Sequence, residues 1–186
     1  MSRLILASTL LVCAALPVRA DEFTDTLESA LSAYREGNVK AASEDLDYAT
    51  KLLGSQKAEA LARFLPPAPE GWSREDQAPD DEGMGMAMFG GGTTVSAVYA
   101  KAATEATLTL LADSPMVTSL GAMMGGLAQF SGAKPMRIQR VEFSEIDGEL
   151  RGLVNNRVLV TVAGDAPSDD KKLLLDAMDF EALAAY

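Results

Sequence analysis

The hydrophobic period changes near residue 93, and this change constrains the fold more than any other feature of the sequence. Val95, Ala97 and Tyr99 share one parity, as on a strand with one buried face. A second alternating run contains Leu108 and Leu110. The two runs are short and adjacent, so we expect them to pair as an antiparallel hairpin.

A further strand is expected after Pro135. Met136 and Ile138 share one parity there, whereas Val141 and Phe143 share the other. A β-bulge inserts one residue into a strand and moves the following side chains to the opposite face. The sequence therefore predicts one strand with a bulge in this region.

Two short polar pairs predict the turns that follow. Asp147-Gly148 and Asn155-Asn156 both tolerate positive φ, as two-residue hairpin turns require. The run 158–162 after the second turn is nearly all apolar, which is typical of a strand in the middle of a sheet.

Two helices are expected among these strands. Ser114-Pro115 places a capping residue before a proline at the first helical position. Ser168 opens the last helix, with Asp169-Asp170 favourably placed at its positive end. The order ββαβββα over 93–186 predicts an α+β fold, an antiparallel sheet with helices on one side.

The helix expected after Ser114-Pro115 has no polar face. No charged residue occurs between Asp113 and Lys134. Such a helix is either buried in the core or covered by a protein partner, including a second copy of the chain. Its glycines are unfavourable in a helix interior unless another backbone approaches closely. The partner-binding candidates on this helix are Gly121, Met124, Gly125 and Gly126.

The segment 22–65 has a helical period instead. One apolar stripe runs from Phe23 to Tyr34 and stops at Gly37, and a second begins at Val39. We expect Gly54 to end the second helix. A third short helix then ends at Pro66-Pro67, because proline cannot continue the helical hydrogen bonds.

Within this segment, ALSAYREGNVKAASEDLDYATKLL resembles a tetratricopeptide helical hairpin. Tyr34 precedes Gly37 at the turn, and the small residues Ala41, Ala42 and Ala49 lie where the helices would cross. The resemblance implies a helix pair that holds a peptide in a groove. Tetratricopeptide arrays stack several 34-residue repeats, and no second copy occurs here, so an ordinary antiparallel helix pair is the alternative.

Residues 66–92 have the composition of a linker, with prolines, glycines and a cluster of acids. Trp72 is the exception, and we expect its large apolar body to anchor the linker on the following domain. The predicted organisation is a helical extension at 21–65, this linker and an α+β domain at 93–186.

The linker ends in a methionine-rich loop. Met84, Met86 and Met88 occupy alternate positions, so an extended chain would project three thioethers to one side. Soft thioethers select Cu(I) over hard cations. The alternative is that the methionines fill gaps under a glycine-rich loop, without any metal.

The first twenty residues have the features of a secretory signal peptide. Arg3 precedes an apolar run from Leu4 to Leu16, and cleavage is expected before Asp21. The run is shorter than the roughly 20 residues that span a membrane. Cys13 resembles the lipidated cysteine of a lipoprotein, but the bulky Val12 before it disfavours this alternative. We therefore expect a soluble periplasmic or secreted protein without a transmembrane segment.

Removal of this segment leaves a chain with neither cysteine nor histidine. Disulfides, thiolate sites, the usual zinc ligand sets and Ser-His-Asp triads are therefore excluded. The whole chain has a net charge of -11, and the first twenty residues carry two arginines and no acid, so the remainder carries about -13. This surface repels nucleic acids and anionic lipids.

No catalytic motif points to an enzyme. The run Asp80-Asp81-Glu82 lies in the expected linker, and helix electrostatics explain the acids after Ser168. We therefore expect a non-enzymatic protein-interaction module of the bacterial envelope without a cofactor. The alternative is a periplasmic protein that binds Cu(I) through its methionines.

Overall fold

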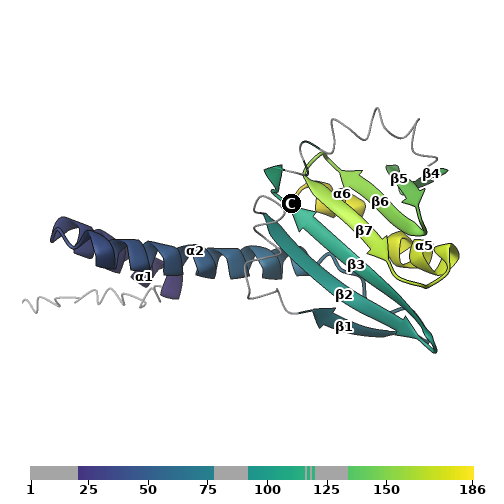
Figure 1. The fold of residues 1–186 in the computed structure, drawn as a ribbon, viewed down its shortest axis with the longest axis horizontal. Coiled ribbons are helices and arrows are strands. Elements are labelled where there is room, and N and C mark those ends of the chain that lie inside the picture. Colours follow the sequence, from purple (N-terminus) through teal and green to yellow (C-terminus); the bar gives the residue numbers. More distant parts are fainter. Residues whose placement is uncertain (1–20, 78–91, 116, 118, 120–133) are drawn as a thin grey trace, which may run out of the picture. The chain divides into compact units, whose positions relative to one another are not determined.

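The computed structural model describes residues 21–77, 92–115, 117, 119 and 134–186 (Figure 1). The described helices are α1 (Glu22–Arg35), α2 (Val39–Ala62), α5 (Ser168–Asp176) and α6 (Phe180–Ala184). The strands are β1 (Ser73–Gln77), β2 (Thr93–Lys101), β3 (Thr104–Ala112), β4 (Lys134–Ile138), β5 (Val141–Ile146), β6 (Glu149–Val154) and β7 (Val158–Ala163). The α+β class is confirmed. None of the described helices is both long and apolar enough to cross a membrane.

The chain forms two compact units, which divide between Leu52 and Leu53. Helix α2 contributes residues 39–52 to the first unit and 53–62 to the second. The predicted helix end at Gly54 is wrong, because α2 continues through this residue to Ala62. A glycine costs only about 1 kcal/mol in a helix interior, which the packing of neighbouring turns can offset.

The first unit is the helical pair that the sequence predicts. The Asp21 carboxylate caps α1 by accepting hydrogen bonds from the Thr24 backbone N–H (2.9 Å) and hydroxyl (2.8 Å). These bonds hold the pKa of Asp21 below its usual value. Gly37 has a φ of 81° in the turn after α1, and the Asn38 side chain accepts a hydrogen bond from Ala41 N–H (3.2 Å) at the start of α2. Each helix therefore begins with a local cap.

The second unit is built on a seven-stranded antiparallel sheet with the order β1-β2-β3-β7-β6-β5-β4. The predicted hairpin is confirmed as β2 and β3, paired from Thr93↔Ala112 to Lys101↔Thr104. The apolar run 158–162 lies in β7, which is the middle strand, as expected. Figure 1 shows these strands side by side in one twisted sheet.

The predicted bulged strand is wrong, since two strands occupy this region. β4 and β5 form a hairpin, with Gln139 (φ 46°) and Arg140 (φ 74°) at its turn. Ile138 pairs with Val141 across this turn. Residues paired across a hairpin share one face of the sheet, so the change of parity marks the turn.

The other two turns have the conformations that the sequence predicts. Asp147 and Gly148 have φ values of 51° and 79°, and Asn155 and Asn156 have 48° and 53°. The second connection also includes Arg157, because Val154 pairs with Val158.

Strand β1 lies within the segment expected to be a linker. It pairs antiparallel with β2 from Ser73↔Ala100 to Gln77↔Ser96 and forms one edge of the sheet. The preceding Trp72 is buried in the core of this unit, so its predicted anchoring role is confirmed. Lys101 covers the indole, with its Nζ 5.4 Å from the ring centroid.

One face of the sheet carries the core. Alternate residues of β2, β3, β6 and β7 are buried there against helical side chains that include Leu61, Leu174, Leu175 and Leu183. The helix predicted after residue 168 is divided into α5 and α6, because the Asp179 carboxylate starts a new helix by accepting from Ala182 N–H (2.9 Å).

The helix predicted after Ser114-Pro115 begins at the expected place. Residues 115, 117 and 119 are helical, and Val117 N–H donates to the Ser114 carbonyl (3.0 Å). The remainder of that helix, from residue 120 to 133, lies outside the described residues.

Candidate functional site

Large apolar side chains are exposed mainly on the helical pair. Eight described large hydrophobic residues are exposed, and all but Leu173 lie between residues 27 and 53. Isolated exposed apolar residues are normal, but a contiguous group of them is typical of an interaction site. The group in the first unit consists of Leu27, Leu31, Tyr34, Val39, Leu46 and Tyr48.

The two helices pack through alanines instead. Ala30 of α1 and Ala42 and Ala49 of α2 are each at least 95 % buried. These positions repeat at helical spacing, so they form one seam between the helices. Small residues in the seam allow close approach of the helices, and the larger apolar side chains remain outside it.

Five of the exposed residues share one face of the helical pair. Leu27, Leu31 and Tyr34 are spaced by four and three residues, so they form one stripe about 90° around α1 from the seam. Val39 and Leu46 are spaced by seven residues and lie about 80° around α2 from its seam. In an antiparallel pair both offsets turn toward the same side. We call these five residues the apolar face.

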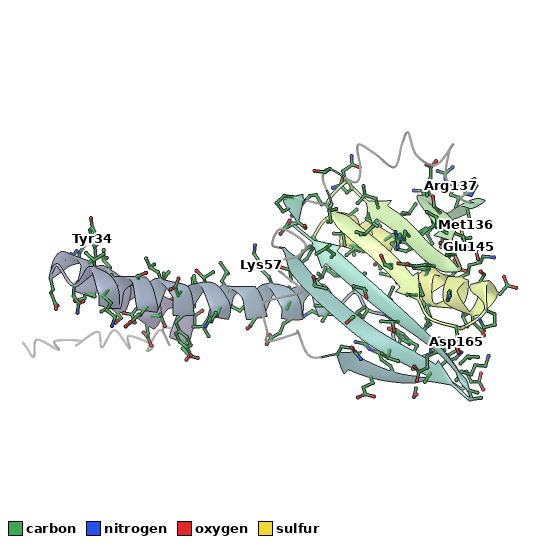
Figure 2. All side chains as sticks on the ribbon, in the orientation of Figure 1. Tyr34, Lys57, Met136, Arg137, Glu145 and Asp165 are labelled. Atoms are coloured by element: carbon green, nitrogen blue, oxygen red, sulfur yellow. The ribbon has the colours of Figure 1, made fainter. Side chains whose placement is uncertain are left out.

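The most exposed member of the apolar face is Tyr34, whose side chain is 67 % exposed. Figure 2 shows it extending away from the ribbon of α1.

The opposite side of the helical pair is polar. The Tyr48 hydroxyl there donates a hydrogen bond of 2.6 Å to the Glu22 carboxylate. This bond and the negative charge of Glu22 raise the pKa of Tyr48. The bond joins residues near the two ends of the pair, which supports the antiparallel arrangement and places Tyr48 outside the apolar face.

Two carboxylates flank the middle of the apolar face. Helical spacing places Glu28 at the outer border of the stripe on α1 and Asp47 at the outer border of the stripe on α2. Both residues are exposed, and neither forms an ion pair with any other described residue. The apolar face is therefore bordered by negative charge on both sides.

The sequence predicted other site residues, and these lie outside the described residues. They are the metal candidates Met84, Met86 and Met88 and the partner-binding candidates Gly121, Met124, Gly125 and Gly126. Across 21–77, 92–115 and 134–186, no group of three or more acidic, histidine or cysteine residues is arranged to hold a metal ion.

The second unit contains two hollows. One, of about 320 Å³, lies between α2 and the β1–β2 edge and is lined by side chains that include Ala58, Ala62 and Val95. The other is wider, about 930 Å³, and lies between α6 and the β5–β6 side of the sheet. Neither brings together a nucleophile and a base among the described residues that line it.

Two polar clusters in this unit have structural roles. The buried Lys171 ammonium donates to the carbonyls of Gly148 (2.6 Å) and Gly164 (2.7 Å), which joins the β5–β6 turn to the end of β7. Asp113 forms ion pairs with Lys57 (3.8 Å) and Arg157 (2.8 Å), so it joins α2 to the β6–β7 turn. Both clusters satisfy their own charges or carbonyls.

Sequence reasoning found the stripes of the helical pair but missed which residues remain exposed. Leu27, Ala30 and Leu31 were taken as parts of a single stripe, whereas Ala30 is buried and the leucines are exposed. The heptad spacing of Ala42 and Ala49 was the available signal for the seam. Comparison with protein families, curated proteins and solved structures gives no match for this chain.

Proposed function

We propose that this chain is an exported envelope protein that acts by binding another protein, through the apolar face of its helical pair, and not by catalysis. The observation that carries the proposal is the exposure of five large apolar residues on one side of two helices. Covering such side chains removes apolar area from water, which is the main driving force of protein association.

Export is supported by the signal-peptide features of residues 1–20. Asp21, the first residue after the expected cleavage site, caps α1. Cleavage at this point would leave the helical pair with its N-terminal cap intact. Intact-mass spectrometry of the protein from its native envelope tests this part, and a lipidated Cys13 or an uncleaved chain would contradict it.

Site-specific photo-crosslinking in the native cells tests the binding function. A photoreactive phenylalanine analogue is placed at Leu31 of the apolar face or at Leu173 of α5 as the matched control. The two side chains are 48 % and 47 % exposed, so they meet solvent to the same extent. We expect a discrete protein adduct from position 31 and none from position 173.

A second change makes the test specific to the apolar face. Leu27→Glu places a charge beside position 31 on an exposed helix surface, where the fold tolerates it. The adduct from position 31 should then be lost. Adducts that form equally from position 173, or that survive Leu27→Glu, would contradict the proposed function.

A further inference from the structure

The charges around the apolar face indicate which kind of partner fits it, and this inference rests on the proposed function. We propose that the apolar face binds an amphipathic helix that has basic residues on both sides of its apolar stripe. The occupant would be a different protein, and not a second copy of this chain.

The shape of the face suits a helix. Two antiparallel helices that meet through alanines leave a shallow groove along the seam, and a third helix packs into such a groove. Helix α1 has 14 residues and is about 21 Å long, so it can cover a partner helix of about four turns. Leu27 and Leu46 lie at the same level of the pair, with Tyr34 and Val39 toward the turn.

The charge around the groove selects the flanks of the partner. Glu28 and Asp47 border the groove on opposite sides, and neither is paired with a cation among the described residues. Lysines or arginines that flank the apolar stripe of a docked helix would meet these two carboxylates. Partial burial of the carboxylates in the complex would then be compensated by opposite charge.

The composition of the whole unit favours the same sign. Residues 21–52 contain eight acids and three bases, a formal net charge of -5. One of the bases, Lys40, already lies 3.7 Å from Glu44. Complementary charge on the partner would also accelerate association, which is most effective at low ionic strength.

A second copy of the chain fits less well. A two-fold interface uses the same patch on both subunits. The carboxylates of Glu28 and Asp47 at the middle of the face would therefore meet the same two carboxylates of the other copy. Two units of charge -5 would also repel one another, so the electrostatics oppose self-association through this face.

Fluorescence anisotropy with designed peptides tests the inference on the full exported protein. The probe is a labelled 14-residue helical peptide with a leucine stripe flanked by lysines. One control peptide has glutamates in place of the lysines, and another has the same composition in scrambled order. We expect the lysine-flanked peptide to bind at least about tenfold more tightly than either control.

Variants of the protein separate specific docking from general attraction between opposite charges. Leu31→Glu removes an apolar contact but adds a negative charge, so it should weaken specific docking about tenfold and would strengthen non-specific attraction. Leu173→Glu adds the same charge at an equally exposed site and should leave the affinity within about twofold. The double variant Glu28→Gln/Asp47→Gln should weaken binding and reduce its salt dependence.

Several results would overturn the inference. These are equal binding of the lysine-flanked and scrambled peptides, tighter binding by Leu31→Glu, or no change in the Glu28→Gln/Asp47→Gln variant. A dimer in analytical ultracentrifugation that Leu31→Glu dissociates would identify a second copy as the occupant. Site-specific adducts in cells combined with failed peptide binding would leave the proposed function standing and overturn only the basic-helix partner.

Discussion

Gly152 of β6 gives the sharpest test of the packing in the second unit. It pairs directly with Phe143 of β5. A Cβ at residue 152 would lie 2.5, 2.6 and 2.7 Å from three carbons of the Phe143 ring. Carbon atoms normally meet at about 3.5 Å or more, so Gly152→Ala requires a shift of the ring or of the strand by about 1 Å.

The ring has little room for this shift. Phe143 is 1 % exposed and lies against Phe180, with 5.6 Å between the ring centroids. Overpacking of this kind costs about 1–3 kcal/mol, and alanine recovers about 0.5–1 kcal/mol of the unfavourable backbone entropy of glycine. We therefore expect Gly152→Ala to lower the free energy of unfolding by about 1–2 kcal/mol.

A double-mutant cycle in chemical denaturation isolates the contact with the ring. Phe143→Leu removes the ring atoms that the new methyl group would meet. In this background Gly152→Ala should cost less than about 0.5 kcal/mol, which gives a positive coupling between the two positions. An equal cost in both backgrounds, or a more stable single variant, would refute the steric reasoning.

Three further predictions concern the fold. At Gly54 an added Cβ meets no atom within 4 Å, so Gly54→Ala should raise the free energy of unfolding by about 0.5–1 kcal/mol in chemical denaturation; a loss of stability would contradict a continuous α2. Lys171→Met removes two hydrogen bonds to carbonyls and should cost about 1–3 kcal/mol in the same assay, whereas a stabilised variant would show that ammonium desolvation dominates. Burial raises the pKa of Tyr99 from 10.0 to about 12, with Asp76 adding to the rise and Arg74 opposing it, so this phenol stabilises the fold below pH 10 and the contribution is lost as the pH rises from 10 to 12. The stability difference between the parent protein and Tyr99→Phe should shrink over this window, and a constant difference would disprove the assignment.

The sequence predicts the centre of the fold better than its borders. β2, β3 and β7 have one face in the core, so their apolar residues must alternate or run continuously. β1 lies at an edge, and its sequence SREDQ has no buried apolar residue to reveal a strand. The β4–β5 turn was missed because Gln139 and Arg140 adopt positive φ, which these residue types seldom do.

The helix boundary at Gly54 failed for a different reason. Leu61 and Leu65 are buried in the core of the second unit, so tertiary packing holds the end of α2 in place. Local propensity carries no information about this packing. The apolar face was missed in a related way, because periodicity shows which residues share a side of a helix but not which side another element covers.

The two outer strands of the described sheet have a consequence for how copies of the protein can associate. Exposed strand edges are templates for open-ended fibril growth. On one edge, β1 carries the charges of Arg74, Glu75 and Asp76, and on the other edge β4 contains Pro135, which has no N–H to donate. Both edges therefore disfavour the addition of a further strand. In a crowded compartment this protection against amyloid-like growth allows the helical pair to keep apolar side chains exposed without the sheet seeding aggregates.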